Sequence, residues 1–267
     1  MKSIHKLAQP TKGDFFDMNE WITHINEWFD MQKIKFVNDF ITGQRWKYIT
    51  NGLLVTLQVT FFAVILGILI GIIIATIRST YDKIYADLRK GSFSRFILKF
   101  FNTLCHIYLT IIRGTPVVVQ LMISYYIIFA SSHNKVLIAV LAFGINSGAY
   151  VAEIIRSGIM SIDEGQTEAG RSLGFNYVQT MCFIVLPQAF KNVLPALANE
   201  FIVLLKETSV SGYVALQDLT RGGDIIRGRT YDAFMPLIAV ALIYLVMVIF
   251  FSYLVAKLER SLRTNER

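Results

Sequence analysis

The amino-acid sequence predicts an all-α membrane protein with five transmembrane helices. Of its 267 residues, 54% are hydrophobic and only 17% are charged, and the mean hydropathy is +0.50. Soluble domains typically carry about 25% charged residues. Apolar segments recur five times along the chain, and a helix of about 20 apolar residues is enough to cross a bilayer. The chain is therefore too apolar for one water-soluble core, and we expect a multi-pass protein of the cell membrane.

Charge and motif content narrow the function classes. The net charge of +7 and the pI of about 9.4 could suggest nucleic-acid binding, but the basic residues flank apolar spans, which fits membrane topology and anionic lipid headgroups better. Cys105 and Cys182 lie in or beside apolar helices and give no disulfide or metal framework. The sequence contains no P-loop, HExxH or GxSxG motif. We expect no catalytic residue, no cofactor, no metal and no nucleic-acid partner.

Residues 1–47 form a polar N-terminal segment, expected to be extracytoplasmic or interfacial. Its polarity argues against a cleavable signal peptide. Trp21, Ile25, Trp28 and Phe29 recur at helical spacing. This spacing is typical of an amphipathic helix lying on a membrane surface, and a partly ordered tail is the alternative.

The first span is expected from Tyr48 to Ile77 and carries a stripe of small residues. Small side chains at every fourth position let two helix backbones approach closely, which favours helix association in lipid. The stripe consists of Ala63, Gly67, Gly71 and Ala75. It predicts close packing against another helix, either in the same chain or at a subunit interface.

A basic loop, 78–99, and an amphipathic segment, 96–112, precede a helix break at Arg113-Gly114-Thr115-Pro116. The second span then continues from Val117 to Ala130. Irregular backbone at membrane depth is tolerated only against protein or a water-filled cavity. Arg113 and Thr115 are therefore candidate residues of a substrate pathway, and a plain interfacial helix start is the alternative.

The third span is expected from Lys135 to Ile155. Glu153 and Arg156 stand three residues apart at its end and could pair. The pair is either structural or part of a gate, and Glu153 is a candidate pathway residue.

A helical elbow is expected between the third and fourth spans, from Gly165 to Pro187. Leu173 ends a first short helix, and Gly174 follows at a position that favours glycine because its φ is positive. Asn176 is predicted to cap a second short helix, with Gln179 completing a capping box. Pro187 should end or bend that helix.

The fourth span, about Ala189 to Tyr213, contains ionisable residues. Intramembrane charges usually face the interior of a bundle and mark a pathway. Lys206 and Glu207 cannot share one helix face, so we expect the helix to loosen there. The candidate pathway residues in this span are Lys206, Glu207, Thr208 and Ser209. A Lys-Glu pair that only stabilises the helix end is the alternative.

A polar loop, 216–232, is expected before the last span, Ala233 to Ala256. The predicted domain therefore covers residues 48–258, with the elbow region at about 158–188 and a tail at 259–267. Five spans place the two termini on opposite sides of the membrane. Lys and Arg near the span ends favour a cytoplasmic C-terminus and elbow, and an outside N-terminus.

Residues of the elbow match a known family motif. Glu168, Ala169 and Gly170, then Gly174, then Ile184, Leu186 and Pro187 keep the spacing of the Glu-Ala-Ala, Gly, Ile-x-Leu-Pro motif of ATP-binding-cassette importer permeases. Gly170 replaces the second alanine of that motif. Three further stretches resemble the polar amino acid branch of the family: 113–116, 147–154 and 205–209. The resemblance covers roughly residues 51–260.

This resemblance implies the type I importer permease fold, in which the elbow is the coupling helix that docks on an ATPase. It assigns ATPase coupling to Gly165, Glu168, Ala169, Gly170, Gly174 and Pro187. It implies ATPase subunits, a second permease subunit (identical or homologous), an extracytoplasmic solute-binding protein and surrounding membrane lipid as partners. The expected function is translocation of polar amino acids, and a pore-forming channel or an unrecognised membrane enzyme is the alternative.

Overall fold

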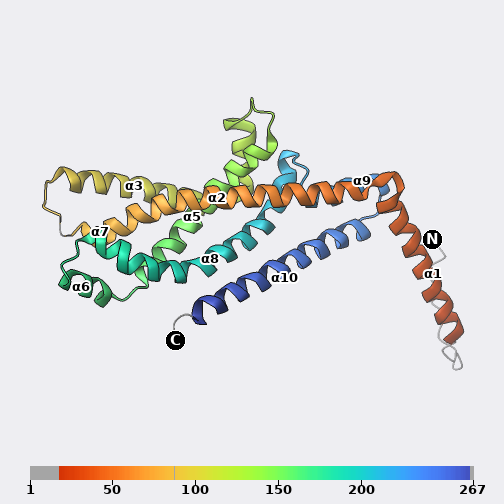
Figure 1. Cartoon of the computed structure of the whole chain (residues 1–267). Coiled ribbons are helices and arrows are strands. Elements are labelled where there is room, and N and C mark those ends of the chain that lie inside the picture. Colours follow the sequence, from red (N-terminus) through yellow and green to blue (C-terminus); the bar gives the residue numbers. More distant parts are fainter. Residues whose placement is uncertain (1–17, 87, 265–267) are drawn as a thin grey trace, which may run out of the picture.

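The structure is a computed structural model that describes residues 18–86 and 88–264. Within these ranges the chain contains α-helices and short 3₁₀ and π segments but no strand. The helices α2, α8 and α10 extend in roughly one direction (Figure 1), while α1 leaves the bundle at one end. Five helices of the described ranges are long and apolar enough to cross a membrane. Their number agrees with the predicted five spans. The second of them is Phe93–Gly114, however, whereas the helix at the predicted position, Val117–Ile128, is shorter.

The centre of the fold is the contact between α2 (Trp46–Ile84) and α5 (Lys135–Met160). A Cβ built on Gly67 would lie 2.9 Å from Oγ of Ser147, and one on Gly71 would overlap Val151. The residue numbers of the contacting positions increase in the same direction along both helices, so α2 and α5 are parallel. Ala63 and Ala75 of the same stripe are fully buried. The stripe is therefore occupied by a helix of its own chain.

The α2 helix continues past the predicted end at Ile77 to Ile84. The segment that follows Ile77 contains neither glycine nor proline, so nothing in it forces the helix to stop. Asp82 forms an ion pair with Arg156 at 3.3 Å, and Tyr81 stacks on Tyr85. These contacts stabilise the extra helical turns, and the expected basic loop is correspondingly shorter.

Because α2 and α5 are parallel, the chain between them must return across the membrane once. That return consists of α3 (Phe93–Gly114), α4 (Val117–Ile123) and the π segment Ser124–Ile128. The predicted break lies between α3 and α4. The side-chain amide of Gln120 donates to the carbonyls of Ile112 at 2.8 Å and Thr115 at 3.1 Å. Carbonyls freed by the break thus have protein partners.

The elbow comprises α6 (Glu164–Ser172) and α7 (Tyr177–Thr180), and the predicted capping box of Asn176 and Gln179 is present. The second helix is not short, however. It continues through a π turn (Met181–Val185), α8 (Leu186–Glu207) and a 3₁₀ segment (Thr208–Val214). The sequence predicted that Pro187 would end or bend this helix, and the helix does not end there. Pro187 lies in the first turn of α8, directly after the π turn, where its missing N–H is tolerated.

The predicted polar loop 216–232 contains a helix, α9 (Leu219–Thr230). The carboxylate of Asp218 caps it by accepting from the backbone N–H groups of Thr220 and Arg221. Burial raises the pKa of Asp218 to about 6. Glycines allow the close packing of α9 on the start of α2, because a Cβ on Gly52 would meet the Asp218 carbonyl oxygen at 2.5 Å.

The last helix, α10 (Phe234–Thr264), continues beyond the predicted end at Ala256. Residues 259–264 of the expected tail are its final turns, and residues 265–267 lie outside the described ranges. The N-terminal segment contains α1 (Met18–Phe36), a π turn (Val37–Ile41) and a 3₁₀ turn (Thr42–Gln44). Residues 1–17 also lie outside the described ranges.

Candidate functional site

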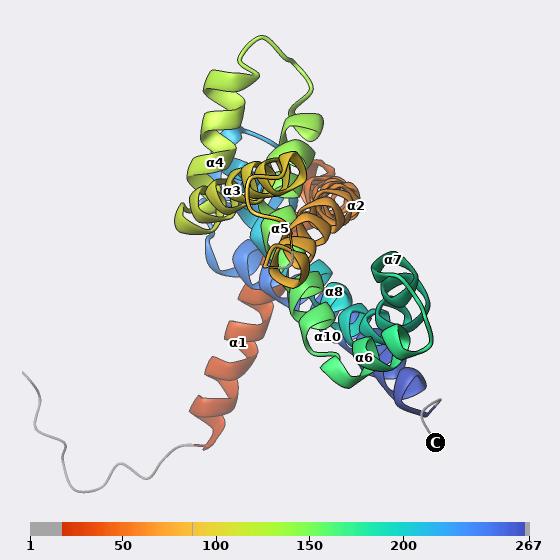
Figure 2. The same ribbon diagram turned by 90° about the vertical axis from the view of Figure 1, so that its left-hand side faces the viewer.

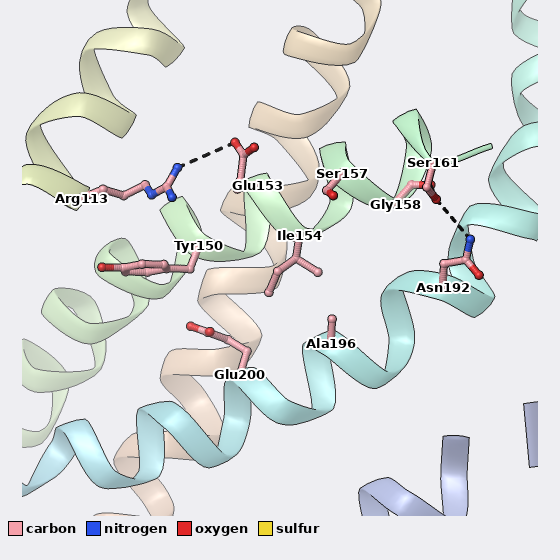
Figure 3. Close-up of a pocket in the computed structure, with 10 residues that line it drawn as sticks. All are labelled: Arg113, Tyr150, Glu153, Ile154, Ser157, Gly158, Ser161, Asn192, Ala196 and Glu200. Atoms are coloured by element: carbon pink, nitrogen blue, oxygen red, sulfur yellow. Dashed lines mark hydrogen bonds and ion pairs between the residues drawn. The ribbon is translucent and has the colours of Figure 1, made fainter. Parts of the chain in front are cut away.

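A cavity of about 480 Å³ opens between the end of α3, the second half of α5 and the middle of α8. Figure 3 shows the side chains around it. Its lining residues are Arg113, Tyr150, Glu153, Ile154, Ser157, Gly158, Ser161, Asn192, Ala196 and Glu200. The cavity combines two carboxylates, a guanidinium and several neutral polar groups with an apolar wall. Such a mixture suits a small polar molecule that carries both charges.

On one side of the cavity, Glu153 of α5 lies between two arginines. Its carboxylate is 2.7 Å from Nη2 of Arg156 and 3.8 Å from Nη1 of Arg113. The Arg113 guanidinium also lies over the ring of Tyr150, 5.7 Å from its centroid. Arg113 therefore has two neighbours on α5, and both belong to the cavity wall. An incoming charged group could exchange with either contact.

On the opposite side, α8 presents Asn192, Ala196 and Glu200, which are four residues apart and share one helix face. Glu200 is only 9% exposed. Its Oε1 accepts a hydrogen bond from Oγ of Ser147 at 2.9 Å. Asn192 donates to Oγ of Ser161 at 3.2 Å. These two hydrogen bonds tie α8 to α5 at both ends of the cavity and fix the position of the Glu200 carboxylate.

A second cavity of about 420 Å³ also borders Arg113 and lies between α2 and α3. Its polar lining includes Arg78, His106 and Thr110, and no residue of its lining is acidic. The two cavities that meet at Arg113 thus differ in charge. One side offers carboxylates and the other offers cationic and neutral donors.

The structure brings together two of the seven predicted pathway residues, Arg113 and Glu153. Thr115 lies at the helix break and donates to the carbonyl of Ile111. The α-helix changes to a 3₁₀ segment after Glu207, at the position where the sequence predicted that the helix would loosen. Thr208 is buried with its hydroxyl bonded to the Leu205 carbonyl. None of the residues from 206 to 209 lines the cavity. Ser209 lines a separate cavity beside α9.

Glu200 is an ionisable residue of the fourth span that was not among the predicted pathway residues. Its hydrogen-bond partner, Ser147, is 53 residues away in the chain. The available signal was the spacing of Asn192, Ala196 and Glu200 on one face. Glu207 follows Glu200 by seven residues and lies on nearly the same face of α8.

The elbow is the second candidate site. Five of its six predicted coupling residues are exposed, and only Gly170 is buried. A Cβ at Gly170 would lie 2.9 Å from atoms of Thr180 and Ile184, which explains the glycine at this position. Large apolar side chains project from the same region: Leu173 is 74% exposed, Val178 65% and Phe183 70%. An exposed apolar surface of this kind indicates a contact with another protein or with the membrane.

Gly174 has a φ of +84°. Its N–H donates to the carbonyl of Arg171 at 2.9 Å, and the N–H of Phe175 donates to that of Gly170 at 3.1 Å. This is the Schellman arrangement that ends a helix on a left-handed residue. It fixes the angle between α6 and α7.

Comparison with known protein families gives a match over residues 90–264. The matching model describes the binding-protein-dependent transport system inner membrane component. The matched range contains the α3–α5–α8 cavity and the elbow.

Several relatives and solved structures are similar to this chain. An arginine transport system permease of Bacillus subtilis is 41% identical over 162 residues, 60% of this chain and 74% of the relative. A glutamine transport system permease of Escherichia coli is 36% identical over 167 residues, 61% of this chain and 76% of the relative. A chain from the crystal structure of an amino acid ABC transporter with histidines matches with a TM-score of 0.71 and 40% identity. That match covers 83% of this chain and 98% of the other.

The MetNI methionine ABC transporter is similar at the level of fold. Its chain gives a TM-score of 0.67 at 19% identity, covering 81% of this chain and 97% of the other.

Proposed function

This chain belongs to the family of binding-protein-dependent transport system inner membrane components, and we propose that it translocates polar amino acids across the cell membrane. It is a multi-pass transport subunit with the fold of ABC importer permeases, as the sequence predicted. ATP hydrolysis belongs to a separate subunit of such transporters. The observation that carries the substrate proposal is the cavity lined by Arg113, Glu153 and Glu200.

The chemistry of this cavity fits an amino acid. A zwitterion loses water from both its ammonium and its carboxylate on crossing the bilayer, and fixed groups must replace that water. Glu153 and Glu200 can accept from an ammonium, and Arg113 can donate to a carboxylate. Because Glu153 already pairs with Arg113 and Arg156, the two carboxylates are balanced by two arginines, and the site suits a zwitterion. The relatives named as arginine and glutamine transport system permeases agree with a polar amino acid as the substrate.

Reconstitution tests the function directly. The permease, its ATPase subunits and the solute-binding protein would be placed in proteoliposomes and supplied with labelled arginine or glutamine. Uptake that needs both ATP and the binding protein is the expected result. Equal flux without ATP would instead identify a channel, and no flux of any amino acid would remove the substrate proposal.

Glu207 extends the proposed pathway by two helical turns beyond Glu200. The Glu207→Gln variant should change the uptake of cationic and neutral amino acids unequally, because it removes one negative charge and hardly alters shape. Ratios of initial uptake rates for arginine and glutamine would measure this. We expect the rate of arginine uptake divided by that of glutamine uptake to fall severalfold, while the binding protein still loads both substrates. Glu27→Gln, on exposed α1, is the matched control, and equal effects on both substrates would make Glu207 structural.

The coupling function is proposed for Gly165, Glu168, Ala169, Gly170, Gly174 and Pro187. Exposure of five of these six residues, together with the projecting Leu173 and Val178, supports an ATPase contact at the elbow. ATP-driven closure of the ATPase pair would move the elbow as a rigid unit. Because α7 is continuous with α8, such movement would reach Asn192 and Glu200 in the cavity. Alternating access then follows from a change in the α5–α8 contact.

We further propose an outside N-terminus, a cytoplasmic C-terminus and a cytoplasmic elbow. The 216–232 segment, including α9, would then face the binding protein. A cysteine at Gly228 is a suitable topology probe, because nothing lies within 4 Å of the site of its Cβ. Labelling of this cysteine by an impermeant maleimide from outside is expected, and labelling only from the cytoplasm would reverse the orientation.

Charge reversal on α9 should weaken the response to the binding protein. Arg227 pairs with Asp224 at 2.5 Å and holds the pKa of that carboxyl below its ordinary value, while Arg229 lies over the Tyr48 ring. The Arg227→Glu/Arg229→Glu variant should lower ATPase stimulation by the binding protein severalfold at low salt. Salt screens exposed charges, so the loss should shrink as ionic strength rises.

The glutamine variant at both arginines is the matched control for that experiment. It removes the Asp224 pair and the contact with Tyr48 but reverses no charge. If both variants lose stimulation equally and at every salt concentration, the arginines stabilise α9 and do not orient the binding protein.

A further inference from the structure

The N-terminal helix α1 is a part of the molecule that the transport function does not explain. It leaves the outer end of α2 and extends away from the bundle, so that its first turns stand apart from the other helices (Figure 2). Figures 1 and 2 together show that α1 runs across the direction of α2, not along it. Since α2 crosses the membrane, α1 runs along the plane of the membrane.

Helical spacing collects apolar side chains on one face of α1. Ile22, Ile25, Phe29 and Phe36 are three, four and seven residues apart and therefore share that face, with Trp28 at its edge. Ile22, Trp28, Phe29 and Phe36 keep 47–54% of their surface exposed. Thr23, Glu27 and Asp30 lie on the other side of the helix, whereas Asn26, beside Ile22, and Gln32, between Trp28 and Ile25, are polar exceptions near the apolar face. Met31 and Ile34 are apolar exceptions on the polar side.

The position of α1 agrees with this pattern. Only the two short turns 37–44 and Arg45 separate it from Trp46, Lys47 and Tyr48, which begin the α2 span. Tryptophan, tyrosine and lysine at the end of a span are typical of the membrane–water boundary. Near the C-terminal end of α1, Nζ of Lys35 pairs with a carboxylate oxygen of Asp232 at 3.6 Å. Asp232 lies just before the start of α10. Both attachments therefore lie at the level of the bilayer boundary.

We infer that α1 lies in the membrane–water interface on the outer side of the cell membrane, with its apolar face in the lipid. Three acidic residues and two lysines give α1 no basic excess, so burial of apolar surface, not attraction to anionic headgroups, must drive the insertion. The helix thereby braces the outer ends of α2 and α10 against the membrane plane. This role is separate from the transport mechanism and stands whether or not the substrate is an amino acid.

The three tryptophans of the chain provide the test. The Trp21→Phe/Trp46→Phe variant leaves Trp28 as the single fluorophore on the apolar face. The matched control adds Trp28→Phe and Glu27→Trp, which moves the fluorophore one residue along the helix to the polar side. Each full-length permease would be reconstituted in vesicles of neutral phospholipid, with and without its ATPase and binding protein.

Lipids brominated in the upper acyl chain should quench Trp28, because an interfacial helix buries its apolar face about 5–10 Å into the boundary region. Aqueous iodide should quench Trp28 roughly threefold less than it quenches the tryptophan at position 27. Equal quenching of both positions by iodide would overturn the inference. Protection of Trp28 that appears only when the other subunits are added would also overturn it and would identify a protein partner.

Discussion

The Gly174→Val variant should insert and assemble like the unchanged permease but lose most ATP-driven uptake. Gly174 ends α6 with a φ of +84°, a conformation that a β-branched residue resists. Forcing it there costs about 1–3 kcal/mol, and every 1.4 kcal/mol is about tenfold in an equilibrium. The elbow would relax to another angle between α6 and α7. We therefore expect uptake to fall about tenfold or more, measured alongside ATP hydrolysis in proteoliposomes.

Two features make this experiment specific. Apart from its chain neighbours, nothing lies within 4 Å of the site of a Cβ on Gly174, so the main expected effect of valine is on backbone conformation. Gly174→Asn is the matched control, because asparagine tolerates positive φ. Uptake should be largely retained in the asparagine variant. Normal uptake by Gly174→Val would mean that the elbow angle does not carry coupling.

Local sequence rules predicted the features that depend on neighbouring residues. The glycine that ends α6, the capping box of α7, the break before Pro116 and the small-residue stripe each follow from a few adjacent positions. The centres of the spans other than the second were predicted in the same way, from the length of each apolar segment. In each case the backbone has few alternatives, so residue type and spacing were sufficient.

The features that were not predicted from the sequence depend on contacts between residues that are far apart in the chain. The α9 helix carries Gly222 and Gly223, which disfavour a helix locally, but these glycines are what let α9 pack on α2 and α10. The π turn before Pro187 has no clear sequence pattern. Glu200 is positioned by Ser147 on another span. The cavity itself could be recognised only once α5 and α8 were placed beside each other.

The Gly67→Leu/Gly71→Leu variant should strongly reduce the yield of folded permease. A Cβ on Gly67 would already lie within 3.2 Å of Ser147 and the Gly148 backbone nitrogen, and one on Gly71 would overlap Val151. Overpacking of this kind typically costs about 1–3 kcal/mol per site. We expect a severalfold loss of monodisperse protein after extraction and a lower melting temperature. Ile73→Phe, which adds bulk on an exposed face of α2, is the control and should change neither.

The two single variants separate packing from transport. Gly67 faces Ser147, which is also the hydrogen-bond donor to Glu200 in the cavity, whereas Gly71 faces Val151. Displacing Ser147 leaves the Glu200 carboxylate without that donor. Uptake per assembled complex should therefore fall further in Gly67→Leu than in Gly71→Leu, even at equal yield. If both variants keep normal yield and uptake, the close approach of α2 and α5 is not required for folding or for placing Glu200.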